Sequence, residues 1–267
     1  VPAVIGGIIS SVSIPIVTSV TAPAGVVQVS PASTSPTLTR LGNEGKTNGW
    51  FFRTITSDAL QGTAAAKYAM DQGMKDLSII HVNNDFGVNM LAEFRRAYEA
   101  LGGKIRSVTP YNPQQPSYAA EVTNALKAEA PALYFIGYPG DGTTIVRTWI
   151  QQGGPQRFLL NDGMNAADFI KGVGPQFLAN AYGTSSGTTK TPSTEFFASA
   201  YPAMSGGFDA GAPAADRAFD AAAILGLAIA HAGRFEAAAI RDAIRKVTDP
   251  AGEVVHAGPQ GFARALQ

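Results

Sequence analysis

Hydroxyl side chains gather at two places where the chain leaves an apolar run. Ser10 and Ser11 follow the run Val4–Ile9, and the segment SPASTSP follows Val26–Val29. A serine at position 10 or 11 could cap a following helix, and Thr34 or Ser35 could cap a helix whose first residue is proline 36. Two helix N-termini that meet, with free N–H groups and spare hydroxyls, make an uncharged anion site. The alternative is that these hydroxyls only cap their own helices.

Side chains that could bind a cation follow two other apolar runs. Asp162 comes after Phe158–Asn161, and Tyr138 comes after Ala132–Ile136. A carboxylate and a phenol at neighbouring strand ends could hold an ammonium group through charge-assisted hydrogen bonds. Asp162 could instead cap a helix over residues 164–171, and Phe86, which follows residues 77–82, could simply pack. An anion site and a cation site in one protein describe a binder of zwitterions, such as a free amino acid.

The elements that would position these side chains alternate between strand and helix. Strands are expected over residues 4–9, 26–29, 51–54, 77–82, 105–109, 132–136 and 158–161, and helices over 11–24, 58–72, 88–101, 118–128, 143–152, 192–203, 214–232 and 235–247. Such alternation predicts an α/β fold with mostly parallel sheets and helices on both faces, in which ligands bind beyond the carboxyl ends of the strands. Ser57 is the expected N-cap of the helix over residues 58–72.

Two polar, glycine-rich segments, Leu41–Gly49 and Gly183–Lys190, interrupt the alternation and indicate domain boundaries. We therefore expect two doubly wound lobes with a cleft between them. Lobe 1 would comprise residues 1–52 and 186–267, and lobe 2 residues 53–185.

The composition excludes several classes of function. Basic and acidic residues balance at 20 each, so the chain lacks the positive charge that nucleic-acid binding requires. No cysteine is present, which excludes disulfides, thiolate zinc sites and cysteine nucleophiles. The three histidines have no metal-like spacing, and His81, within an expected strand, is interpreted as structural. The first twenty residues are apolar but contain Pro2, Pro15 and Gly6-Gly7, which argues against a membrane span, and they lack the basic start of a signal peptide.

Two motifs suggest enzymes. GTSSG at 183–187 matches the pattern of a hydrolase nucleophile, but the required helix does not follow at once. Gly140 and Gly142 follow an expected strand as in a dinucleotide-binding turn, with Asp162 about 20 residues on, but the third glycine is absent. A nucleotide-dependent enzyme is the alternative from another functional class.

Taken together, the motifs AVIGG, VSPASTSPTLT, FFRT, SDALQGTAAAKYA, NNDFG, GYP and NDGM resemble those of solute-binding proteins of ABC importers for branched-chain amino acids. These proteins have the type I periplasmic binding fold. The resemblance implies that Ser10, Ala32, Ser33 and Thr34 bind the ligand carboxylate, and that the Ala32 carbonyl also meets the amine. It implies that Tyr138 and Asp162 hold the ammonium, while Phe86 and Ile9 line the side-chain region.

The resemblance also implies a function without catalytic residues, metal or cofactor. The expected partners are a small ligand and a membrane permease, not nucleic acid, and the expected form is an extracytoplasmic monomer that closes on its ligand by a hinge. Family members often carry Glu where Asp162 stands and a hydroxylated aromatic where Phe86 stands. A binder of another carboxylate, such as an aromatic acid or an amide, is therefore the alternative on the same fold. Members also extend beyond both ends of the matched region, which predicts an incomplete first lobe.

Overall fold

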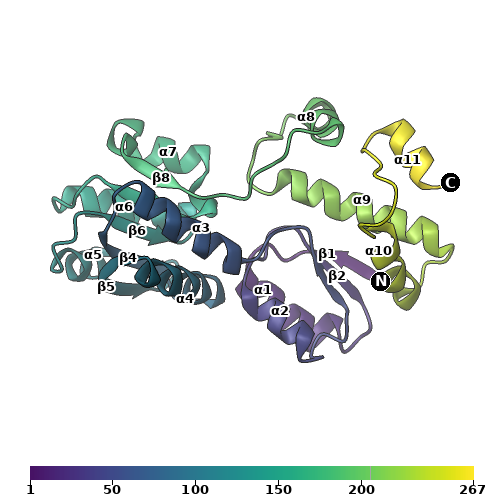
Figure 1. The fold of residues 1–267 in the computed structure, drawn as a ribbon, viewed down its shortest axis with the longest axis horizontal. Helices are drawn as coiled ribbons and strands as arrows, with labels where there is room; N and C mark the ends of the chain where they lie inside the picture. The colour runs from purple at the N-terminus through teal and green to yellow at the C-terminus, as the bar shows by residue number, and fades with distance from the viewer. Residues whose placement is uncertain (205) are drawn as a thin grey trace. The chain divides into compact units, whose positions relative to one another are not determined.

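The computed structural model describes residues 1–204 and 206–267, which divide into two compact units (Figure 1). The first unit comprises Val1–Ile55 and Gly187–Gln267, and the second comprises Thr56–Ser186. Each unit contains one parallel sheet, with strand order β1-β2-β3 in the first and β5-β4-β6-β7-β8 in the second. The expected α/β fold with parallel sheets is thus confirmed.

The first unit places three strands between two groups of helices. Its elements are β1 (Ala3–Ile5), α1 (Ser10–Ile16), the π-helical turn η1 (Val17–Thr21), β2 (Val27–Ser30), α2 (Pro36–Asn43), β3 (Phe51–Arg53), α8 (Pro192–Met204), α9 (Ala215–Ala232), α10 (Ala237–Val247) and α11 (Pro259–Ala265). Val27 and Val29 pack with α9 and α10, whereas a smaller cluster of Val17, Ala22 and Leu38 forms another core. β2 is buried throughout, and its Gln28 is bonded to Thr21 and to the Gly6 carbonyl.

The second unit is a doubly wound sheet. Its elements are α3 (Asp58–Asp71), β4 (Asp76–Val82), α4 (Asp85–Ala100), β5 (Lys104–Tyr111), α5 (Ala119–Leu126), β6 (Leu133–Ile136), α6 (Pro139–Gln151), β7 (Phe158–Leu160), η2 (Asp162–Met164), α7 (Ala167–Val173), η3 (Pro175–Leu178) and β8 (Ala181–Gly183). The chain moves from β4 outward to β5 and then back through β6 to β8. Because parallel crossovers are right-handed, this reversal puts α4 on one face and α5, α6 and α7 on the other. The reversal also brings the carboxyl ends of β4 and β6 next to each other.

Several boundaries differ from the sequence expectation. The first strand ends at Ile5 rather than Ile9, because Gly6 has a φ of 146° and turns the chain. α4 begins three residues before the expected Val88, since Asn84 caps it by accepting a bond from the Gly87 N–H. α6 begins at Pro139 rather than Thr143, with proline at the first helical position. The predicted cap at Ser57 is confirmed by its bond from the Ala59 N–H.

His81 is a structural residue, as expected. It lies within β4, is 5% exposed, and its Nδ1 is 3.0 Å from the Val82 carbonyl oxygen. Burial lowers its pKa, so the ring stays neutral at physiological pH.

Neither a membrane helix nor a metal cluster is found in residues 1–204 and 206–267. No single helix there combines the length and the apolar composition needed to cross a membrane; α9 and α10 combine them only together, as a pair bent by 112°. No group of three or more histidine and acidic side chains in those ranges could hold a metal ion.

Candidate functional site

A cluster of buried hydroxyls joins the starts of α1 and α2 in the first unit. The Ser10 hydroxyl accepts a hydrogen bond from the Ser35 N–H at 3.1 Å, and the Ser35 hydroxyl caps α2 through the Thr37 N–H at 3.2 Å. The predicted cap at Ser35 is confirmed, with Pro36 as the first helical residue. The predicted cap at Ser10 or Ser11 is wrong, because α1 begins at Ser10 and its N-cap is Ile9, whose side chain makes no capping bond. Ser10 instead bridges to the other helix.

Serines also hold the loop between β2 and α2 in shape. The Ser33 hydroxyl lies 2.7 Å from that of Ser13 and 3.2 Å from the carbonyl oxygens of Gly7 and Ile8. Ser30 accepts a bond from the Ser33 N–H at 3.0 Å and donates one to the Gly7 carbonyl. Ser33 is fully buried, so its visible contribution is to position the loop, and its contact with a ligand stays a prediction.

The other predicted residues of the first unit surround this cluster. Thr34 is 3% exposed and lies between Ser33 and the α2 cap. Ala32 is half-buried, and its N–H points to the Ser30 hydroxyl at 3.4 Å. Ile9 is half-buried at the start of α1. The structure therefore gathers all five residues predicted for this unit around one pair of helix starts.

Arg53, at the end of β3, is a residue of this cluster that the sequence reasoning did not assign. Its guanidinium donates to the carbonyl oxygens of Ser33 and Ser35, each at 3.1 Å, and to the Thr39 hydroxyl at 2.7 Å. It thereby orients two peptide groups of the loop. The signal in the sequence was the arginine at the end of the short strand FFR.

Asp162 lies directly after β7 in the second unit, where amides hold its carboxylate. Its Oδ1 accepts hydrogen bonds from Gln61 at 3.1 Å and from Asn161 at 3.3 Å. The alternative in which Asp162 caps the next helix is wrong, because α7 begins at Ala167 with Ala166 as its N-cap. Asp162 is half-exposed and forms no ion pair with any described residue. Its negative charge is therefore not compensated within the unit.

Tyr138 follows the end of β6, and its hydroxyl is bonded to Asn84, which follows the end of the neighbouring strand β4. Asn84 donates to this hydroxyl at 3.3 Å, which leaves the phenol proton for another acceptor. Burial raises the pKa of Tyr138 to about 12, with the Asp162 charge adding to the rise and the Asn84 bond opposing it. The phenol therefore stays protonated and uncharged at neutral pH, and toward a cation its oxygen can act only as a hydrogen-bond acceptor.

Phe86 lies in the first turn of α4 and stacks on Tyr138. The ring centroids are 5.5 Å apart with an interplanar angle of 30°, and Phe86 is 5% exposed. Phe86 therefore packs against Tyr138, and its predicted contact with the side chain of a ligand stays a prediction. Asn84, which both caps α4 and binds Tyr138, was not assigned from the sequence, although an asparagine at a helix start is a known signal.

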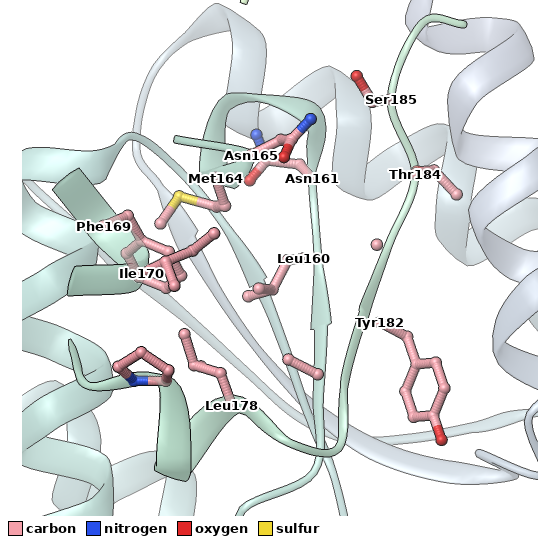
Figure 2. A pocket seen from close by; sticks show the side chains of 13 residues that line it. Leu160, Asn161, Met164, Asn165, Phe169, Ile170, Leu178, Tyr182, Thr184 and Ser185 are labelled. Carbon is pink, nitrogen blue, oxygen red and sulfur yellow. The ribbon is translucent and has the colours of Figure 1, made fainter. Parts of the chain in front are cut away.

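A cavity of about 450 Å³ lies beside β7 and β8 in the second unit. Figure 2 shows Met164, Phe169, Ile170 and Leu178 on one side and the segment bearing Tyr182, Thr184 and Ser185 on the other. Asn161, the neighbour of Asp162, lines this cavity, but none of the predicted site residues does.

Neither enzyme-like motif has the backbone conformation that its enzyme function requires. Gly140 and Gly142 lie inside α6 rather than in a turn before it. A Cβ at Gly142 would come within 2.6 Å of Met164 Cε and 2.8 Å of the Phe135 ring, so this glycine permits close packing. No helix follows GTSSG at once, since the next one is α8 from Pro192, and a nucleophile elbow is therefore absent.

Comparison with known proteins finds a matching family and several relatives. A sequence profile of the periplasmic binding protein family matches residues 1–264. A Leu/Ile/Val-binding protein homolog of Brucella suis is 29% identical over 175 residues, which cover 64% of this chain and 45% of that protein. The chain thus matches less than half the length of this curated relative.

Solved structures with the same fold include two binding proteins. A leucine-binding protein of Thermotoga maritima, LivK, superposes with a TM-score of 0.80 at 25% identity, over 98% of this chain and 74% of that one. The branched-chain amino acid transporter substrate-binding protein LivJ of Streptococcus pneumoniae, in complex with isoleucine, superposes with a TM-score of 0.77 at 22% identity, over 94% of this chain and 70% of that one. With its profile match across nearly the whole sequence and its type I fold, the chain belongs to the periplasmic binding protein family, a family of solute-binding proteins.

Proposed function

We propose that this chain binds a small zwitterion, an aliphatic amino acid, as the solute-binding component of an ABC importer. The observation that carries the proposal is the Asp162 carboxylate, which is oriented by two amides and keeps its charge for a cation. A carboxylate that has no counter-ion among residues 1–204 and 206–267, beside a phenol oxygen that can accept a hydrogen bond, suits a ligand ammonium group. The amino acids named for the relatives, leucine, isoleucine and valine, support the same ligand class.

The opposite end of the ligand would meet the hydroxyl cluster of the first unit. Ser10, Ala32, Ser33 and Thr34 are the residues proposed to bind the ligand carboxylate, with Arg53 holding their loop. The two units would act as lobes that close by a hinge and bury the ligand. The closed, monomeric form would then dock on a membrane permease outside the cytoplasm.

Isothermal titration calorimetry of the wild-type protein tests the proposal. We expect leucine to bind at least tenfold more tightly than 4-methylpentanoate, which is leucine without its amine, because only leucine can use Asp162. Titrations with 4-hydroxybenzoate and NAD test the two alternatives, and neither is expected to bind. The proposal would be contradicted if 4-hydroxybenzoate bound more tightly than leucine, or if NAD bound at all.

Thr34→Val tests the carboxylate end. Valine keeps the shape of threonine but removes its hydroxyl, so we expect both leucine and 4-methylpentanoate to bind about tenfold more weakly, since both carry the carboxylate. The control is Thr63→Val, at an exposed position of α3, which should leave both affinities unchanged. Unfolding temperatures of both variants verify the fold, and an unchanged affinity in a folded Thr34→Val protein would remove Thr34 from the site.

A further inference from the structure

Gln61 connects three segments of the second unit that are distant in sequence. It lies on α3 and is 8% exposed, and its Nε2 donates both to Asp162 Oδ1 and to the Thr184 carbonyl oxygen, each at 3.1 Å. Both acceptors are oxygens without a proton, so the side-chain nitrogen, not the oxygen, must face them. The two N–H groups of the amide are thereby both used.

The second residue that bonds to the Asp162 carboxylate, Asn161, is also uncharged and is itself held by the backbone. Asn161, 2% exposed, donates to the same Oδ1 and to the Gly137 carbonyl at 3.1 Å, while its own oxygen accepts from the Gly137 N–H at 2.9 Å. Among residues 1–204 and 206–267, none donates a side-chain hydrogen bond to Asp162 Oδ2. One oxygen is thus held in place by amides, and the other is left for a ligand.

An amide at position 61 leaves the charge of the Asp162 carboxylate in place, which a cationic side chain would not. Lysine or arginine would orient the carboxylate and also neutralise it, whereas glutamine orients it and leaves its charge. A carboxylate fixed before binding also loses less side-chain entropy when a ligand arrives.

We propose that Gln61 is a positioning residue that sets the orientation of Asp162 and thereby the preference for ligands with a protonated amine. This inference rests on the proposed function, because it assumes that Asp162 meets a ligand ammonium. Through the Thr184 carbonyl, the same side chain ties the site to the segment that follows β8.

The test is a double-mutant cycle of wild type, Gln61→Met, Asp162→Ala and the double variant, each titrated with leucine and 4-methylpentanoate. Methionine has about the length of glutamine but cannot donate a hydrogen bond. We expect Gln61→Met to weaken leucine binding about fivefold and to change 4-methylpentanoate binding less than twofold. In the Asp162→Ala background, the same substitution should change leucine binding less than twofold, because coupled residues are not additive. Gln151→Met, at an exposed position of α6, is the matched control and should change nothing.

Equal losses for both ligands, or the same loss with and without Asp162, would show a general structural role and overturn the inference. If Gln61→Met does not fold, Gln61→Asn replaces it, since the shorter amide cannot reach Asp162. If the wild-type protein binds no amino acid, the proposed function fails. Crystal structures of the ligand-free wild-type and Gln61→Met proteins then test separately whether Gln61 orients Asp162. An Asp162 side chain that keeps its orientation in the variant would overturn it, whereas a displaced or disordered carboxylate would support it.

Discussion

Replacing Asp162 with alanine is expected to weaken leucine binding by at least tenfold and by up to about a hundredfold. Hydrogen bonds to charged groups contribute about 1.5–3 kcal/mol, which corresponds to roughly 10- to 150-fold in affinity. Among the residues that the structure describes, the partners of this carboxylate are the amides of Gln61 and Asn161, so a ligand ammonium would supply the opposite charge that those residues do not. Calorimetric titration of wild type and variant with leucine measures the loss.

Two controls separate this effect from a general loss of structure. Asp168→Ala removes an exposed acid from the first turn of α7, six residues away, and should leave leucine binding unchanged. The ligand 4-methylpentanoate carries no amine, so Asp162→Ala should not weaken its binding. An Asp162→Ala protein that binds leucine as tightly as wild type would exclude Asp162 from the site.

Replacing Gly87 with alanine is expected to lower the free energy of unfolding of the second unit by about 3 kcal/mol, at the upper end of the range for overpacking. A Cβ at this position would lie 2.0 Å from the Val82 carbonyl oxygen and 2.7 Å from Val82 Cγ1. The start of α4 would have to move away from the end of β4. Because Asn84 caps this helix and binds the Tyr138 hydroxyl, ligand affinity should fall as well.

Gly140→Ala is the matched control for this prediction. Gly140 also lies in the first turn of a helix that follows a strand, but a Cβ there would have no neighbour within 4 Å. Alanine is the better helix former, so this change should be neutral or slightly stabilising. Urea unfolding in a Trp50→Phe background, where Trp149 is the sole tryptophan and reports on the second unit, measures both variants. Equal stability of the Gly87→Ala and Gly140→Ala proteins would contradict the expectation.

Local signals explain why much of the fold could be predicted. Ser57 before α3 and Pro36 at the start of α2 identify helix starts within a few neighbouring residues, and the structure places both helices there. The start of α4 was missed by three residues, because the capping role of Asn84 was not recognised. The first strand was predicted too long, because apolar residues continue to Ile9 beyond the glycine that turns the chain.

The sequence by itself determined most of the order of strands and helices, though not β8 or α11, and also the hydroxyl-rich loop before α2, the acid after β7 and the family to which these motifs belong. Only the tertiary structure decided which side chains support one another. Gln61 and Asp162 are separated by 101 residues, and Ser10 and Ser35 by 25, so no local pattern predicts their bonds. Capping and turn formation depend on a few neighbouring residues, whereas these contacts depend on how distant elements pack, and that packing is what orients the Asp162 carboxylate.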